Sequence, residues 1–156
     1  MSLSALFDAL KIQETVCIPA GWTQGRANYG GLVAAMLYAR TQSVLPDGRE
    51  LRSATVSFVA PVATAEVTVT ARVLRQGKSV IQTEAHMLQN GDVVAVLLCS
   101  FGVGRESAIQ VQSALAPTFK SPEDGLVLPV LPGLTPDFVQ HIDFRWTHGD
   151  LPFSGS

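Results

Sequence analysis

Residues 25–42, with the sequence GRANYGGLVAAMLYARTQ, form the segment that decides the fold of this chain. The stretch 32–39 is apolar on every side and leaves no polar face. A helix of that kind is normally buried, and this one is far shorter than the roughly 20 apolar residues that cross a membrane. The segment therefore predicts a long helix that the protein itself surrounds.

Gly30 and Gly31 stand at the start of this helix. Each glycine costs a helix about 1 kcal/mol relative to alanine, but glycine also lets a ligand come close to the backbone. The first N–H groups of a helix have no partner within it and lie at the positive end of its dipole. Gly30 and Gly31 are therefore candidate catalytic positions, where the backbone polarises a carbonyl or binds an oxyanion. The alternative is that two glycines merely let a buried helix begin in a crowded place.

Length and composition limit the class of protein and of partner. The chain has 156 residues, a formal net charge of −2 and no cluster of Lys or Arg, so we expect one domain of ordinary size and no nucleic-acid partner. Hydrophobic residues make up 47% of the chain and charged residues 15%, which favours a large core or a buried subunit interface. The N-terminal sequence lacks the basic region and long apolar run of a signal peptide, which predicts a cytoplasmic protein with no membrane partner.

Cys17 and Cys99 are isolated in the sequence. Isolated cysteines are typical of buried reduced thiols, and a disulfide or a metal site is not predicted from them. His86 falls on the polar face of a predicted strand, where a solvated or partner-covered surface is expected. His141 and His148 have no metal-ligand spacing with it, so we predict no metal.

The rest of the sequence predicts a short helix and an antiparallel sheet. We expect the helix over residues 5–10, capped by Ser2 or Ser4, and a short strand over 15–18. Alternating or apolar runs predict four longer strands at 51–59, 66–74, 79–88 and 93–101. Turn signals separate the segments at Pro46-Asp47-Gly48, Gly77 and Asn90-Gly91. The run 93–101 is almost wholly apolar, which is typical of a central strand covered on both faces.

The C-terminal third of the chain differs in character. Residues 105–140 contain five prolines and little periodicity, which is typical of a linker or of an arm laid over a surface. One more strand is expected at 141–147. The sequence therefore predicts a domain over residues 1–104, a proline-rich linker or arm over 105–140, and the start of a second unit over 141–156.

Four short motifs follow one another at a characteristic spacing, namely YGG at 29–31, FVAP at 58–61, LRQGKS at 74–79 and QNG at 89–91. In this order they resemble the N-terminal half of the acyl-CoA thioesterase II family, over about residues 3–101. The resemblance implies the hotdog fold, an α+β architecture in which an antiparallel sheet wraps around one long buried helix. The predicted helix followed by a meander of strands has that arrangement.

The resemblance also implies a function. In that family two similar halves of one chain pack together, and the catalytic Asp, Thr and Gln lie in the second half. The chain is expected to hydrolyse or bind acyl-CoA thioesters without a cofactor, with the helix N-terminus polarising the thioester carbonyl. The alternative is a non-catalytic acyl-binding or structural half whose catalytic residues lie in a missing second half. A hotdog hydratase or dehydratase is a weaker hypothesis, because no His or Asp is placed near the helix.

Several further residues are candidates for the site. Asn28 precedes the helix, where it either orients a water molecule or caps the helix. Tyr29 and Phe58 are candidate substrate-binding residues. The resemblance implies the same role for Arg75, Lys78 and Ser79, because this turn lies near the acyl-CoA site in the family. Phe58, Trp22 and Met36 either line an acyl tunnel or belong to the core. The turn residues either contact the nucleotide phosphates or form a solvated hairpin.

A single hotdog domain leaves one sheet edge and one helix face uncovered. We therefore expect a homodimer or a larger assembly.

Overall fold

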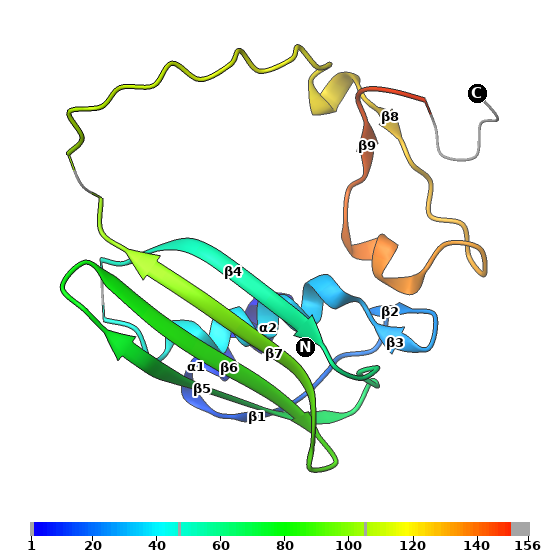
Figure 1. The fold of residues 1–156 in the computed structure, drawn as a ribbon. Coiled ribbons are helices and arrows are strands. Elements are labelled where there is room, and N and C mark those ends of the chain that lie inside the picture. The colour runs from blue at the N-terminus through cyan, green and yellow to red at the C-terminus, as the bar shows by residue number, and fades with distance from the viewer. Residues whose placement is uncertain (1, 47, 105, 151–156) are drawn as a thin grey trace. The chain divides into compact units, whose positions relative to one another are not determined.

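The first part of the chain is built on an antiparallel sheet of five strands in the order β1-β5-β6-β7-β4. The computed structural model describes residues 2–46, 48–104 and 106–150, and the chain divides into two compact units, residues 1–105 and 106–156 (Figure 1). The sheet consists of β1 (Thr15–Cys17), β4 (Glu50–Phe58), β5 (Glu66–Gln76), β6 (Val80–Gln89) and β7 (Asp92–Gly102). The other elements of this unit are α1 (Leu3–Ile12), β2 (Thr23–Gln24), β3 (Ala27–Asn28) and α2 (Gly30–Gln42). The predicted α+β architecture is confirmed.

Helix α2 lies against one face of the sheet, where it contacts β5, β6 and β7 (Figure 1). Its side chains toward the sheet and α1 are buried, among them Leu32, Val33, Met36 and Leu37. The predicted central helix is thus confirmed, with one difference. The helix is not buried on every side, because Gly31 and Gln42 are exposed and five of its residues are half-buried, namely Gly30, Ala34, Ala35, Tyr38 and Arg40. A sheet covers only one side of a helix, and α1 covers only part of another.

The sheet face toward α2 carries the core. Alternate residues of β5, β6 and β7 are buried there, among them Val67, Val69, Ile81, Ala85, Met87, Ala95, Leu97 and Phe101. Strand β7 lies between β6 and β4, as predicted for a central strand. Within the described residues of the first unit, no element covers its opposite face, where Leu98 is 47% exposed. Cover on both faces of this strand is therefore not provided by the first unit and stays a prediction.

Tight turns join the long strands. Asn90 has φ 55° and Gly91 has φ 89°, the positive values of a two-residue hairpin turn, which confirms the predicted hairpin. The Gly77 N–H donates to the Val80 carbonyl over 2.8 Å and closes the β5–β6 turn. The turn predicted at Pro46-Asp47-Gly48 includes Asp47, which lies outside the described residues.

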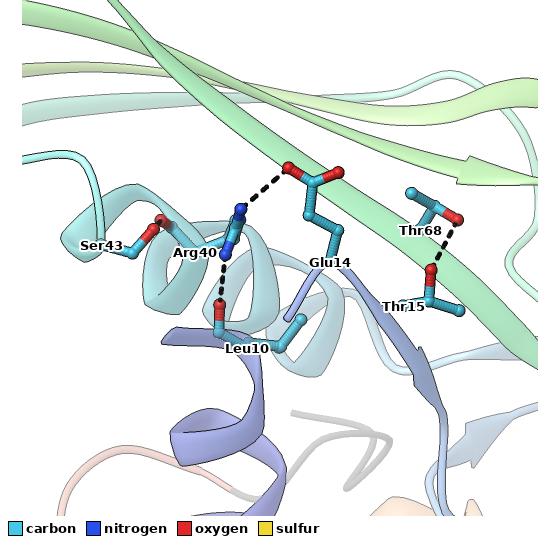
Figure 2. Close-up of polar contacts among 6 residues, drawn as sticks. All are labelled: Leu10, Glu14, Thr15, Arg40, Ser43 and Thr68. Atoms are coloured by element: carbon cyan, nitrogen blue, oxygen red, sulfur yellow. Dashed lines mark hydrogen bonds and ion pairs between the residues drawn. The ribbon is translucent and has the colours of Figure 1, made fainter. Parts of the chain in front are cut away.

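Helix α1 is held at both ends. The Ser2 hydroxyl accepts a hydrogen bond from the Ala5 N–H over 3.2 Å, so Ser2 is the cap. At the other end, Arg40 of α2 donates from Nη1 to the Leu10 carbonyl over 3.2 Å and from Nη2 to Glu14 Oε1 over 2.8 Å (Figure 2). Only 13% of the Arg40 side chain is exposed. Arg40 therefore ties the end of α1 to α2.

The two cysteines differ in their surroundings. Both are free, and Cys99 is buried on the inner face of β7, whereas Cys17 on edge strand β1 is exposed. Successive side chains of a strand point to opposite faces, and here Val16 takes the buried position. The prediction that both thiols are buried is therefore wrong for Cys17.

The second unit contains little regular structure. Its elements are η1 (Pro122–Asp124), β8 (Leu126–Val127), η2 (Asp137–His141) and β9 (Arg145–Trp146), and β8 pairs with β9. The strand predicted over 141–147 is therefore reduced to the two residues of β9, because η2 occupies the chain as far as His141. That residues 141–156 begin a second hotdog unit stays a prediction, and 151–156 lie outside the described residues. No helix in the described ranges of the chain is long and apolar enough to cross a bilayer.

Candidate functional site

A groove of about 380 Å³ opens at the N-terminus of α2. Three parts of the chain form it, and they are distant in sequence. The lining comes from the β2–β3 hairpin, from the first turn of α2, and from the end of β4 with the loop after it; the loop residues 59–62 are called the groove wall. The lining residues are Gln24, Ala27, Asn28, Gly30, Val33 and Phe58 to Val62.

The backbone at this helix end has free donors. The Tyr29 carbonyl accepts from the N–H groups of Leu32, over 3.0 Å, and Val33, over 3.2 Å, which closes the first turn. Among the described residues, none accepts a hydrogen bond from the N–H of Gly30 or Gly31. These donors lie at the positive end of the helix dipole. The start of α2 therefore offers a carbonyl oxygen two hydrogen-bond donors, that of Gly30 in the groove and that of Gly31 beside it.

An aromatic ring lies close to each of the two glycines. A Cβ atom on Gly30 would lie 3.0 Å from Cζ of Phe58, and one on Gly31 would lie 2.3 Å from Cε1 of Tyr29. A distance below 3.0 Å cannot stand, so any side chain at position 31 would displace the Tyr29 ring. The steric crowding that was the alternative explanation of the two glycines is thus present, and the groove is present as well. Phe58 lines the groove, whereas Tyr29 and Gly31 lie beside it.

Asn28 is fixed by hydrogen bonds that do not involve the helix. Its backbone N–H and its Nδ2 both donate to the Val62 carbonyl, over 2.8 Å and 3.1 Å. Its Oδ1 accepts from the Thr64 hydroxyl over 3.2 Å. Tyr29 holds the N-cap position and makes no side-chain capping bond, so the prediction that Asn28 caps the helix is wrong. Strand β3 directs its side chain toward the loop after β4 instead.

Arg75, Lys78 and Ser79 do not line the groove. They flank the β5–β6 turn, at the opposite end of β6 from Gln89. The Lys78 carbonyl accepts from Nη1 and Nη2 of Arg49, each over 3.2 Å, and the Ser79 carbonyl accepts from the Val103 N–H. The structure therefore brings Asn28, Gly30 and Phe58 together and leaves the turn residues apart from them.

Some lining residues were not singled out from the sequence. Trp22 and Met36 belong to the buried core and do not line the groove, whereas Gln24, Ala27 and Val33 do. Loop residues 59–61 belong to the FVAP motif, which indicated the family but did not indicate that these residues line a groove. A small residue such as Ala27 carries no signal of function by itself, so only the fold could reveal it.

The groove has limited chemistry of its own. Its lining includes the amide side chains of Gln24 and Asn28 and no carboxylate or imidazole group. His86 lies on the outer face of the sheet, with Nε2 3.7 Å from Glu84 Oε1 and beside the Arg72–Glu84 ion pair. Within the described ranges, no group of three or more His, Cys, Asp or Glu residues could hold a metal ion. The groove can therefore polarise a carbonyl but does not supply a base.

Solved structures share this fold. A hotdog-fold protein of unknown function from Alicyclobacillus acidocaldarius aligns with a TM-score of 0.72 and 24% identity, over 86% of this chain and 52% of that one. A putative thioesterase II from Thermobifida fusca aligns with a TM-score of 0.70 and 18% identity, over 88% of this chain and 52% of its own. This chain thus spans about half the length of both proteins. These likenesses confirm the hotdog fold.

The sequence itself matches a family. No curated protein is similar enough to this chain to match it. The family model described as the acyl-CoA thioesterase N-terminal domain matches residues 18–102, which is more than half of the 156-residue chain and includes the groove. The chain therefore belongs to the family of acyl-CoA thioesterase N-terminal domains.

Proposed function

We propose that this chain binds the thioester of an acyl-CoA in the groove at the N-terminus of α2 and takes part in its hydrolysis. The observation that carries the proposal is the pair of free N–H groups at the start of α2, that of Gly30 in an otherwise largely apolar groove and that of Gly31 beside it. Family membership supports the substrate class. A thioester has an apolar acyl chain and one carbonyl oxygen in need of donors, and the groove matches both.

In the proposed reaction, a water molecule attacks the thioester carbonyl carbon. The carbonyl oxygen gains negative charge, and the N–H groups of Gly30 and Gly31 stabilise it at hydrogen-bond distance. The C–S bond then breaks, the acyl group leaves as a carboxylic acid, and the CoA sulfur takes the proton that water gave up. Asn28 is an amide and cannot be the base, so in this proposal it holds the groove wall and a second copy of this chain supplies the base.

A second candidate is binding without hydrolysis. The specific observation in its favour is the groove lining, which contains no carboxylate or imidazole side chain. In this case the chain would hold an acyl-CoA, or support a catalytic partner, and turnover would need a hotdog unit of another sequence that carries the catalytic residues. A cytoplasmic location, and a nucleotide-binding role of Arg75, Lys78 and Ser79, stay predictions.

The two candidates are separated by a thiol-release assay with a panel of acyl-CoAs, together with calorimetric titration of a non-hydrolysable acyl-CoA thioether. Turnover by the whole chain supports hydrolysis. Binding of the thioether without turnover supports the second candidate. If the chain neither turns over nor binds any member of the panel, the proposed function is wrong.

The role of the helix N-terminus is tested by Gly30→Pro, with Gly30→Ala as the matched control. Proline is tolerated at the first position of a helix, and Tyr29 already has ψ 127°, which suits a residue before proline. Both variants add a Cβ against Phe58, but only proline removes the N–H. We expect Gly30→Pro to lower kcat by about 100- to 1,000-fold relative to Gly30→Ala. Equal rates for the two variants would exclude this N–H from the mechanism.

A further inference from the structure

The loop that walls the groove has an unusual path. Strand β4 is at one edge of the sheet, whereas β5, which follows it in the chain, lies beyond β7 and β6. Residues 59–65 must therefore cross the ends of those two strands. At β7, the N–H groups of Val59 and Ala60 donate to the Val94 carbonyl over 2.9 Å and 3.1 Å. At the far side, the Ile18 N–H donates to the Ala65 carbonyl over 3.0 Å.

Gln89, the last residue of β6, supports the middle of the crossing. Its Oε1 accepts from the Ala63 N–H over 2.9 Å, and its Nε2 donates to the Ala63 carbonyl over 3.0 Å and to the Glu66 carbonyl over 3.4 Å. The side-chain amide thus pairs with both backbone groups of one residue, as a neighbouring strand would. Gln89 is 7% exposed, so its polar atoms have little access to water as an alternative partner.

Asn28 holds the same loop from the other side. Its two donors meet at the Val62 carbonyl, one residue before Ala63. The buried polar residues of the described chain are Asn28, Thr41, Thr83 and Gln89, and two of these four bind this loop. A buried amide is costly unless it is paired, so both side chains and the loop fix one another.

We propose that Gln89 is a positioning residue for the acyl-CoA groove. It does not line the groove, but it fixes Ala63 and so holds residues 59–62, which form the groove wall, at the distance from α2 that the acyl group requires. The inference rests on the proposed function, because it assigns Gln89 to the same groove.

The test compares Gln89→Met with two controls in the whole chain. Methionine is close to glutamine in size and removes all three hydrogen bonds. Gln82→Met makes the same change on the exposed outer side of the same strand. Leu6→Val removes a buried methylene from α1, which lowers stability without contact with the loop. Affinity for the non-hydrolysable acyl-CoA thioether is measured by calorimetry, and amide hydrogen exchange of residues 59–65 by NMR.

We expect Gln89→Met to weaken thioether binding about tenfold and to speed exchange of the Ala63 N–H by a similar factor, since each lost bond contributes to holding the wall. Gln82→Met and Leu6→Val should leave affinity unchanged. Loss of affinity in Leu6→Val as well would mean that stability alone is measured, which would overturn the inference. So would wild-type affinity in Gln89→Met.

Two further outcomes also decide the matter. If Gln89→Met does not fold, hydrogen exchange in the wild type decides instead. Ala63 is exposed, so exchange of its N–H should be more than about tenfold slower than in an unprotected amide only if Gln89 binds it. Free exchange there would overturn the inference. If the wild type fails to bind the thioether, the proposed function is the part that has failed, and the positioning role falls with it.

Discussion

The thiol of Cys99 illustrates how one buried residue responds to pH. Cys99 is 3% exposed, and burial raises its pKa from 9.0 to about 11 because the charged thiolate loses its water. In the unfolded chain the thiol ionises at its ordinary pKa. The contribution of Cys99 to stability is therefore fully present below pH 9.0 and is lost as the pH rises toward about 11.

This difference predicts selective labelling near neutral pH. A thiol reagent reacts with the thiolate, so exposed Cys17 should react in the folded protein and Cys99 only after unfolding. Mass spectrometry should find one label per chain in native buffer and two in denaturant. In a Cys17→Ala variant native labelling should vanish. Rapid native labelling of that variant would show that Cys99 is accessible and contradict the prediction.

The residue-scale site was only partly predictable. Gly30 and Gly31 could be placed at the helix start because the apolar run that predicts the helix follows them directly, and the structure places Gly30 in the groove and an aromatic ring against each glycine. The role of Asn28 could not be read from its position next to the helix. Its partners Val62 and Thr64 are more than thirty residues away in sequence, and only the fold brings them together.

At the scale of elements, one cation links α1 to α2. The Arg40 guanidinium binds the Leu10 carbonyl, which lies in the last turn of α1 where helix carbonyls have no partner within the helix. It also binds Glu14, just after α1 (Figure 2). Because Arg40 is 13% exposed and Glu14 51% exposed, most of the stabilisation should come from the carbonyl and not from the ion pair.

We therefore expect Arg40→Met to lower the free energy of unfolding by about 1–2 kcal/mol, since methionine keeps the apolar stem and removes the donors. Glu14→Gln removes the charge from the exposed partner only and should cost about 0.5 kcal/mol or less. Urea denaturation followed by circular dichroism measures both. A loss in Glu14→Gln as large as that in Arg40→Met would show that the ion pair dominates.

The elements themselves followed from the sequence where the pattern was strong. The meander could be predicted from the alternation in β5 and β6 and from the Asn90-Gly91 turn signal. A period-two pattern indicates a strand, and residues that accept positive φ between two such patterns indicate a hairpin. The small β2–β3 hairpin was missed, since two-residue strands have no period to detect. The source of the cover on the outer face of β7 could not be predicted, because an apolar run marks a place that can be covered and does not say by what.

At the scale of the whole molecule, β4 is the strand whose edge and apolar side chains are available for a contact with another unit. It pairs only with β7 among the described strands, so one edge of it is free. Leu51, Ala54, Val56 and Phe58 pair with the buried β7 residues Phe101, Cys99, Leu97 and Ala95. Cross-strand partners share a face, so these β4 side chains lie on the α2 side of the sheet. Yet Leu51 is 41% and Phe58 58% exposed.

An apolar strand face beside a half-covered helix is the kind of surface that a second hotdog unit would bury. We therefore expect the chain to form a dimer or a larger assembly through β4 when no other unit is present, and Val56→Lys to prevent it, because a lysine there would be buried without a counter-charge. Thr55→Lys is the matched control, since Thr55 pairs with Leu98 and points to the opposite face. Light scattering on a size-exclusion column should give at least twice 16.6 kDa for the wild type and for Thr55→Lys, and 16.6 kDa for Val56→Lys. A wild-type monomer would mean that this face stays open, and dissociation by Thr55→Lys alone would place the contact on the outer face of the sheet.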